Sequence, residues 1–290
     1  MSASPVFPFI RGLGDIIDGY AAVLCDLWGV LHDGRHAFPE ALAALRRARA
    51  AGRLVVLLTN VPRPGRLIVD DFRRFGIPAD ICDGVITSGD VSRSLLRQSG
   101  AHAVLHIGKA RNLSLFEGID VALVDDAAAE IIVCTSLADE EHETPALYRD
   151  RLERLAARGL TLFCANPDRV AQRGSGFVYC AGALADLYAE LGGTVVISGK
   201  PNPPIYDAAM TELARLAGRP LARSEVLAIG DGLPTDIAGA VRNGFDALMV
   251  TSGIHAGDFG APDRPDPQRL TDRLAADDLT IRAAISHLRW

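Results

Sequence analysis

The chain has 290 residues, of which 49% are hydrophobic and 23% are charged, and its formal net charge is −6 at pH 7. This composition is ordinary for a globular protein and suits one large α/β domain or a core domain with a smaller insert. An acidic chain without a Lys/Arg cluster argues against nucleic acid as the main partner.

The sequence also lacks features of a membrane or oxidising environment. The five cysteines are far apart and form no CxxC or Cys/His zinc spacing, which is typical of reduced thiols. No apolar stretch approaches the roughly 18 residues of a membrane span, and the first residues do not have a signal-peptide pattern. We therefore expect a cytoplasmic protein with no membrane partner.

The first part of the chain alternates between expected strands and helices. One apolar run stops at Asp26, and further strands are expected at residues 54–58 and 85–87. Prolines open two helices and glycines follow their ends, which is the usual asymmetry of helix termini. The helices of this part are expected to begin at Pro39, Pro64 and Ser88.

The alternation continues to residue 250. Strands are expected at 104–107, 121–124, 131–134 and 160–164, with helices at 145–157 and 181–191. A strand (194–197), a helix (204–216), a strand (226–229), a helix (235–241) and a last strand follow, and then a surface loop at 253–268. Repeated βαβ units predict a parallel sheet, so the expected fold class is α/β.

Polar residues follow the ends of four apolar runs. In chain order these residues are Asp26, then Thr59 and Asn60, then Lys200, then Asp231 and Asp236. In open α/β sheets, ligands bind just outside the carboxyl ends of the strands. A nucleophilic carboxylate, a hydroxyl, a lysine and an acidic pair are what phosphoryl transfer through an aspartyl phosphate requires.

Each carboxylate has a catalytic and an ordinary interpretation. Asp26 is a nucleophile, a metal ligand or a salt-bridged core residue. Asp231 and Asp236 stand in a Gly-Asp-Gly-x-x-x-Asp loop and, beside Asp26, would hold a hard cation such as Mg²⁺. Alternatively, Asp231 is a turn residue and Asp236 is a charge favoured at a helix N-terminus.

The lysine and the hydroxyl are equally ambiguous when taken alone. Lys200 precedes Pro201, which favours an extended backbone, and its charge would neutralise a phosphate and Asp26. A solvated surface lysine is the alternative, and no GxxxxGK[ST] motif makes it a Walker lysine. Thr59 and Asn60 either donate hydrogen bonds to phosphate oxygens or simply form a turn.

Taken together, these segments resemble the haloacid dehalogenase (HAD) superfamily, specifically its class IIA phosphatases. The resemblance spans nearly the whole chain and rests on residues 26–31, 57–60, 199–206 and 230–237. It implies a Rossmann-like parallel-sheet core with an inserted smaller α/β cap domain of the C2a type. On this basis we expect the core at residues 1–88 and 192–290, and the cap at residues 89–191.

The resemblance implies a Mg²⁺-dependent phosphatase of small phosphorylated metabolites. Asp26 would be the nucleophile that carries the aspartyl phosphate, and Thr59 and Lys200 would bind the transferred phosphoryl group. The metal site would consist of Asp26, the main-chain carbonyl of Trp28, Asp231 and Asp236.

The substrate-binding candidates are Asn60 and two residues of the expected cap. Asn166 and Asp168 belong to an Asn-Pro-Asp segment that is usual in this class, although an ordinary β-turn is the alternative. The expected partner is a small-molecule phosphate ester, and class IIA members often form homodimers through the cap. A dinucleotide-binding protein is excluded, because the glycines at 12 and 14 lack a preceding strand and the remaining fingerprint glycine.

Trp28 departs from the family pattern. In most phosphatases of the superfamily, the residue two after the nucleophile is an aspartate that protonates the leaving alcohol and then deprotonates water. General acid–base catalysis contributes roughly 10²–10⁴-fold to the rate. With Trp28, the chain is a slow enzyme, uses another group such as His32 or Asp33, or binds a phosphorylated ligand without efficient hydrolysis.

Overall fold

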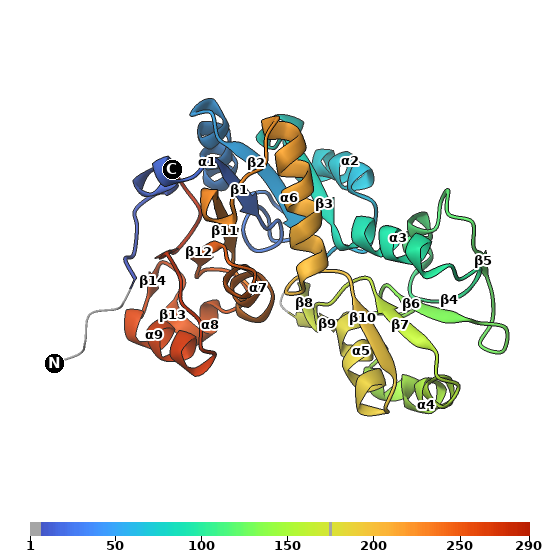
Figure 1. Cartoon of the computed structure of the whole chain (residues 1–290). Coiled ribbons are helices and arrows are strands. Elements are labelled where there is room, and N and C mark those ends of the chain that lie inside the picture. Colours follow the sequence, from blue (N-terminus) through green and yellow to red (C-terminus); the bar gives the residue numbers. More distant parts are fainter. Residues whose placement is uncertain (1–6, 174–175) are drawn as a thin grey trace. The chain divides into compact units, whose positions relative to one another are not determined.

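The computed structural model describes residues 7–173 and 176–290 (Figure 1). These residues form two compact units. The first unit draws on three stretches of the chain, within Met1–Thr59, Val69–Ile86 and Tyr206–Trp290. The second unit is formed by the intervening stretches, Asn60–Ile68 and Thr87–Ile205. The second unit is therefore inserted into the first, and the chain passes from the first unit into the second at two separate points.

A six-stranded sheet forms the centre of the first unit. Its strands are β1 (Ala22–Cys25), β2 (Leu54–Thr59), β3 (Gly84–Thr87), β11 (Val226–Gly230), β12 (Asp246–Val250) and β15 (Ala283–Ile285). Their order in the sheet is β15-β12-β11-β1-β2-β3, and the pairs from β15 to β2 are parallel. The direction of strand addition thus reverses between β1 and β11, which is where ligands bind in such sheets.

The two strands at this reversal are completely buried. Every residue of β1 and β11 is buried, as expected for parallel strands that are covered on both faces. In helix α1 (Pro39–Ala50) the buried residues Ala41, Leu45 and Ala48 recur at the helical period, so one face of the helix packs on the core. The other helices with residues in this unit are α2 (Gly65–Phe75), α6 (Pro203–Ala217), α7 (Ala238–Arg242), α8 (Ala256–Phe259) and α9 (Pro267–Ala276).

A five-stranded sheet forms the centre of the second unit. Its strands are β4 (Ala103–Ile107), β5 (Ala122–Leu123), β6 (Ile131–Cys134), β7 (Thr161–Cys164) and β10 (Thr194–Ile197). Their order is β10-β7-β6-β4-β5, and all neighbours are parallel. The unit also contains the helices α3 (Ser88–Ser99), α4 (Arg149–Ala157) and α5 (Ala181–Glu190), and a two-stranded antiparallel ribbon of β8 (Val170–Arg173) and β9 (Gly176–Tyr179).

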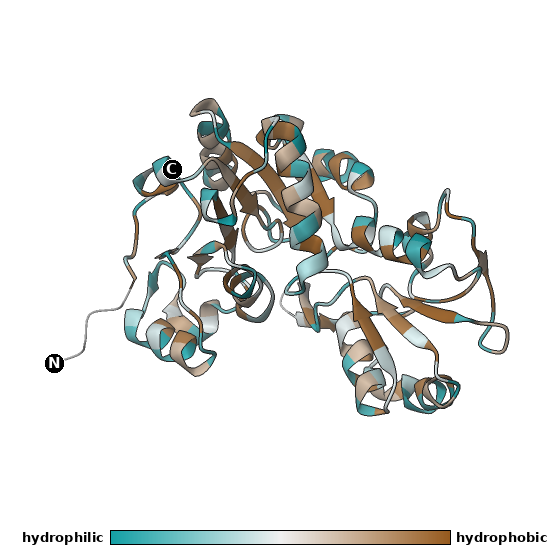
Figure 2. Cartoon of the chain, in the orientation of Figure 1, coloured by the Kyte–Doolittle hydropathy of each residue, from teal (hydrophilic) through white to brown (hydrophobic). Residues whose placement is uncertain are grey.

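Successive residues of the second sheet alternate between two apolar clusters. Ile132 and Leu162 belong to one cluster, whereas Val133 and Phe163 belong to the other. A parallel strand that is buried on both faces is apolar along its whole length, and Figure 2 shows much of β7 in the brown of hydrophobic residues. The second unit therefore has its own core on each side of its sheet. This arrangement confirms the expected parallel α/β fold class.

The division of the chain differs from the expected boundaries at residues 89 and 192. The run at 194–197 forms β10, which pairs with β7 in the second sheet and places Val196 beside Phe163. The segment up to Ile205, which includes Lys200, belongs to the second unit and not to the first. An apolar pattern identifies a strand, but it does not identify the sheet that the strand joins.

Three local elements also differ from the sequence-based expectations. The expected surface loop at 253–268 contains α8 and the short strands β13 (Gly260–Ala261) and β14 (Arg264–Pro265). The helix expected at 235–241 begins as a π-helical turn, Leu233–Ile237. Thr87 caps α3 in place of Ser88, because the Thr87 side chain accepts a hydrogen bond from the N–H of Asp90.

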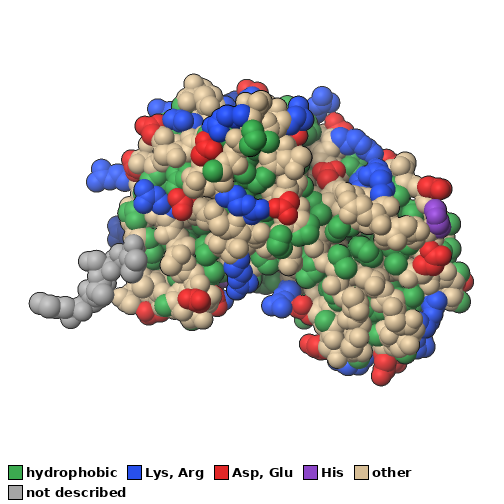
Figure 3. Space-filling view, in the orientation of Figure 1, with side chains coloured by type: hydrophobic (Ala, Val, Ile, Leu, Met, Phe, Trp, Pro, Cys, Tyr) green, Lys and Arg blue, Asp and Glu red, His purple; other side chains and the backbone are tan. Residues whose placement is uncertain are grey.

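None of the described helices combines the length and the apolar character that crossing a membrane requires. On the face shown in Figure 3, acidic and basic side chains are interspersed. Exposed pairs such as Arg46–Asp80, at 2.9 Å, are screened by water and contribute little to stability. The buried apolar residues inside each of the two units, and not these surface pairs, therefore stabilise the fold.

Candidate active site

Asp26 and Asp231 directly follow the two strands at the reversal of strand order. β1 ends at Cys25 and β11 ends at Gly230, and the strands are parallel neighbours. The main-chain N–H of Asp26 donates to the carbonyl of Ile229 at 2.9 Å, which extends the strand ladder by one residue. Both carboxylates therefore lie at the same carboxyl edge of the sheet.

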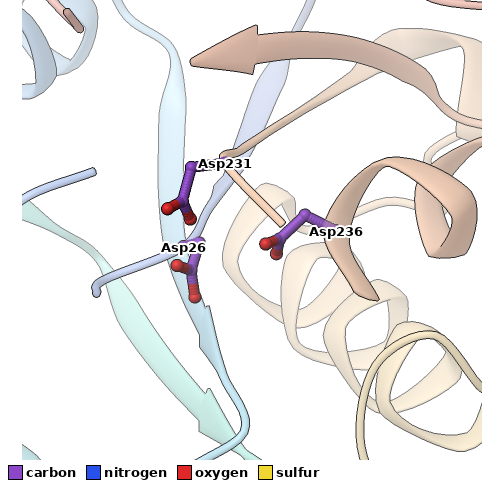
Figure 4. A group of neighbouring side chains, drawn as sticks. All are labelled: Asp26, Asp231 and Asp236. Atoms are coloured by element: carbon purple, nitrogen blue, oxygen red, sulfur yellow. The ribbon is translucent and has the colours of Figure 1, made fainter. Parts of the chain in front are cut away.

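Asp26, Asp231 and Asp236 form a group of three buried carboxylates (Figure 4). One oxygen atom from each residue lies within 4.8 Å of the others. Negative charges at this spacing repel one another, and burial makes each charge costlier. A hard cation that prefers oxygen ligands, such as Mg²⁺, offsets this repulsion. The donor set therefore fits the metal expected from the sequence.

Asp236 reaches this group from the turn that follows β11. The N–H of Gly232 donates to Oδ2 of Asp236 at 3.0 Å, and the N–H of Asp236 donates to the carbonyl of Gly232 at 2.8 Å. A Cβ atom at Gly230 would lie only 2.2 Å from the Cβ of Asp236. The Gly-Asp-Gly spacing thus permits a tight turn that returns Asp236 to the strand end.

Main-chain atoms enclose the carboxylate of Asp231. The N–H of Ile254 donates to its Oδ2 at 2.7 Å. A Cβ atom at Gly253 would lie 1.9 Å from the same oxygen, and one at Gly29, whose φ is +80°, would lie 2.1 Å from it. These three residues were not identified from the sequence. Only the Gly29 position, three residues after Asp26, carried any signal there, because it belongs to the segment that supports the family resemblance.

Thr59 lies at the same edge of the first sheet. It is the last residue of β2, which pairs with β1 so that Leu57 lies beside Cys25, and it is buried. In this register Leu58 is level with Asp26, and Thr59 lies one residue beyond it at the same end of the sheet. The structure thus gathers four of the predicted site residues, Asp26, Thr59, Asp231 and Asp236, at the carboxyl ends of the strands of the first unit.

The other predicted polar residues belong to the second unit, where Asn60 connects them. The amide nitrogen of Asn60 donates to Asp168 Oδ1 at 2.9 Å and to the carbonyl of Lys200 at 3.2 Å, and its Oδ1 accepts from the N–H of Lys200 at 2.8 Å. Oδ1 of Asn166 accepts from the N–H of Asp168 at 3.2 Å, as in an Asx turn. Asn60 thus holds the backbone of Lys200, and the predicted turn is present.

Trp28 packs within the loop that follows β1. Its ring contacts the ring of His32 edge to face, with centroids 5.1 Å apart, and His32 stacks on Phe75 with centroids 4.7 Å apart. A Cβ atom at Gly34 would lie 2.3 Å from the Trp28 ring, so the loop backbone passes directly against the indole. Trp28 is nevertheless 40% exposed.

His32 and Asp33, the predicted substitutes for an acid/base aspartate, are held in other ways. The Nδ1 of His32 accepts from the N–H of Gly34 at 3.0 Å, and burial lowers the pKa of His32 to about 4. For Asp33, burial raises the pKa but hydrogen bonds from the N–H groups of His36 and Arg35 outweigh it, so the pKa is lowered. At neutral pH, His32 is neutral and Asp33 is ionised, which makes both poor general acids.

Comparison with known proteins identifies the family. A model described as haloacid dehalogenase-like hydrolase matches residues 23–122, and a second HAD hydrolase-like model matches residues 197–277. A crystal structure of a haloacid dehalogenase-like hydrolase from Brucella suis 1330 is 41% identical, with a TM-score of 0.86, and covers 97% of this chain and 100% of that chain. The chain belongs to the haloacid dehalogenase-like hydrolases.

Curated relatives of this HAD-like hydrolase are named as phosphatases. Ribonucleotide monophosphatase NagD of Escherichia coli strain K12 is 27% identical over 80% of this chain and 88% of its own length. The phospholysine phosphohistidine inorganic pyrophosphate phosphatase of Bos taurus is 28% identical over 83% of this chain and 86% of its own length. These names agree with the enzyme class predicted from the sequence, a phosphoric monoester hydrolase.

Replacing Gly29 by alanine is expected to displace Asp231 and to abolish phosphatase activity with Mg²⁺. The matched control is Gly52→Ala, because Gly52 has the same φ of +80° but no atom within 4 Å of an added Cβ. Both variants should lose about 1–2 kcal/mol from the left-handed backbone, which thermal unfolding measures. Only Gly29→Ala should lose p-nitrophenyl phosphate hydrolysis, and equal activity of the two variants would contradict this account of Gly29.

The hydrogen bond between Asn60 and Asp168 can be tested by exchanging the amide and the carboxylate between the two positions. Asn60→Asp should lower the unfolding temperature, because it places a second carboxylate where the amide donates to Asp168 at 2.9 Å; the lost buried hydrogen bonds cost about 1–3 kcal/mol. Adding Asp168→Asn restores an amide opposite a carboxylate and should recover part of the loss. A double variant no more stable than Asn60→Asp would show that this contact does not stabilise the second unit.

Proposed function

We propose that this protein is a Mg²⁺-dependent phosphatase of small phosphorylated metabolites that works through an aspartyl phosphate on Asp26. The observation that carries the proposal is the group of buried carboxylates at the reversal of strand order, Asp26, Asp231 and Asp236. The sheet supplies a ligand-binding edge there, and the carboxylates supply both a nucleophile and cation ligands.

Asp26 is the proposed nucleophile because it stands at the end of a buried strand beside two further carboxylates. Asp231, Asp236 and the main-chain carbonyl of Trp28 would hold the metal together with one oxygen of Asp26. When bound, the metal screens the negative charge that otherwise keeps a carboxylate from approaching a phosphate dianion. Thr59 would donate a hydrogen bond to a phosphoryl oxygen at the same edge of the sheet.

Residues of the second unit complete the proposal. Lys200 would neutralise charge on the phosphoryl group, and the hydrogen bonds of Asn60 hold the Lys200 backbone in place. Asn166 and Asp168 are the proposed contacts to the rest of the substrate, which we take to be a small phosphate ester. One curated relative is named for a ribonucleotide, and another is named for phospholysine, phosphohistidine and inorganic pyrophosphate. These names have the phosphoryl group in common, which supports a phosphorylated substrate for this chain.

A second candidate function is binding of a phosphorylated ligand without efficient hydrolysis. Trp28 favours it, because tryptophan has no ionisable group with which to protonate a leaving alcohol or deprotonate water. The two functions are separated by turnover, since enzymes typically turn over at about 1–10³ s⁻¹. Tight ligand binding with no turnover of any phosphorylated metabolite would favour the second function.

Asp26→Asn is expected to abolish phosphate release from p-nitrophenyl phosphate in the presence of Mg²⁺, because an amide cannot act as the nucleophile. Asp18→Asn is the matched control, since Asp18 is a surface carboxylate of the same unit with a side chain 91% exposed. The control should keep wild-type activity. Phosphate release by Asp26→Asn at the wild-type rate would overturn the proposal.

Removal of divalent cations with EDTA is expected to abolish activity, and added Mg²⁺ should restore it. Mg²⁺ should also raise the unfolding temperature, because a cation relieves the repulsion among three buried carboxylates; binding at 100 times the dissociation constant adds about 2.7 kcal/mol. In Asp231→Asn this thermal shift should shrink. If the unfolding temperature of the wild-type protein does not change when Mg²⁺ is added, the proposed metal site is contradicted.

A further inference from the structure

The loop after β1 offers no arranged proton donor for a leaving group. Trp28, two residues after Asp26, has no ionisable atom. The Nδ1 of His32 is occupied by the N–H of Gly34, and its ring packs between the rings of Trp28 and Phe75. These contacts fix His32 as part of the packing of the loop.

Asp33 and His36 are the other titratable side chains of this segment; their nearest side-chain atoms lie 3.8 Å apart, and the His36 side chain is 81% exposed, so it is not held in the site. The Oδ1 of Asp33 accepts hydrogen bonds from the main-chain N–H groups of Arg35 and His36, at 2.8 and 2.7 Å. Both bonds stabilise the carboxylate form, and the residue is exposed to water. Asp33 therefore stabilises the turn of the loop as a carboxylate, and in this form it carries no proton that it could transfer to a leaving group.

From these contacts, and resting on the proposed function, we infer that the substrates are phosphorylated compounds whose leaving oxygen departs as a stabilised anion, as in aryl and acyl phosphates. The reason is the chemistry of the departing group. The pKa of a phenol is about 10 and that of a carboxylic acid is about 4, whereas the pKa of water, and of alcohols like it, is far higher. A phenolate or carboxylate therefore leaves without a proton, whereas an alkoxide needs one.

The two chemical steps then balance without a proton from the protein. In the first step, a carboxylate oxygen of Asp26 forms a bond to phosphorus as the bond to the leaving oxygen breaks, and that oxygen departs with the electron pair as an anion. In the second step, a water oxygen bonds to phosphorus and the bond to Asp26 breaks. Asp26 returns as a carboxylate, and both protons of the water remain on the product, dihydrogen phosphate.

The absence of an arranged base in the described loop after β1 affects the second step. No side chain of Trp28, His32 or Asp33 is positioned to remove a proton from the attacking water. Breakdown of the aspartyl phosphate is then slower than its formation from a good leaving group. The enzyme is therefore expected to release the first equivalent of leaving group in a burst, and all good substrates should share nearly the same kcat.

The test is a series of aryl phosphates that span a range of phenol pKa, extended with an alkyl phosphate, assayed with the full-length protein and Mg²⁺. For the wild-type enzyme, kcat/KM should fall steeply with rising leaving-group pKa. In Trp28→Asp, which supplies an acid, kcat/KM for the alkyl phosphate should rise by roughly 10²–10⁴-fold. The dependence should flatten and the burst should disappear, whereas Trp28→Phe should keep both the steep dependence and the burst.

A shallow dependence in the wild-type enzyme would overturn the inference, because it would show that another group protonates the leaving oxygen. This result does not depend on whether Trp28→Asp folds. Failure of the proposed function is a different outcome, since the wild-type enzyme would then release no phenolate from p-nitrophenyl phosphate above the Asp26→Asn control.

Discussion

The placement of three buried carboxylates at one edge of a parallel sheet is the constraint on which the rest of the site depends. Asp26 and Asp231 arrive there because β1 and β11 are neighbours that end at the same level, and Asp236 arrives through a tight turn. One oxygen of each residue lies within 4.8 Å of the others, a spacing at which buried negative charges repel one another and a bound cation offsets the repulsion. The protein surrounds Asp231 with backbone, at Gly29, Gly253 and the N–H of Ile254.

The same strand end explains why this chain departs from an acid/base phosphatase. The loop after Asp26 uses its ring systems for packing, with Trp28 against His32 and His32 on Phe75. A site with the proposed nucleophile and metal ligands, and with no acid arranged in this loop, is suited to substrates that supply their own good leaving group. In this account the proposed metal site and substrate class follow from two residues that are two positions apart, Asp26 and Trp28, for separate physical reasons.

The sequence allowed the α/β class and the carboxylate group to be predicted, because both depend on local patterns: apolar runs that end in Asp26 or in Gly-Asp-Gly. It did not allow the assignment of β10, since an apolar run does not specify the sheet that the strand joins; in the structure β10 pairs with β7, and the segment of Lys200 belongs to the second unit. The contacts of Gly253 and Ile254 with Asp231 bring together residues more than 20 positions apart, which no local pattern encodes.

The central claim is that Asp26 accepts the phosphoryl group. The most direct measurement is mass spectrometry of peptides from enzyme that has been mixed with p-nitrophenyl phosphate and Mg²⁺ and quenched in acid within the burst. The account predicts a phosphoryl group on the peptide that contains Asp26, and none on the same peptide of Asp26→Asn. Release of nitrophenolate by an enzyme that never carries a phosphoryl group, or that carries it on another residue, would contradict the account.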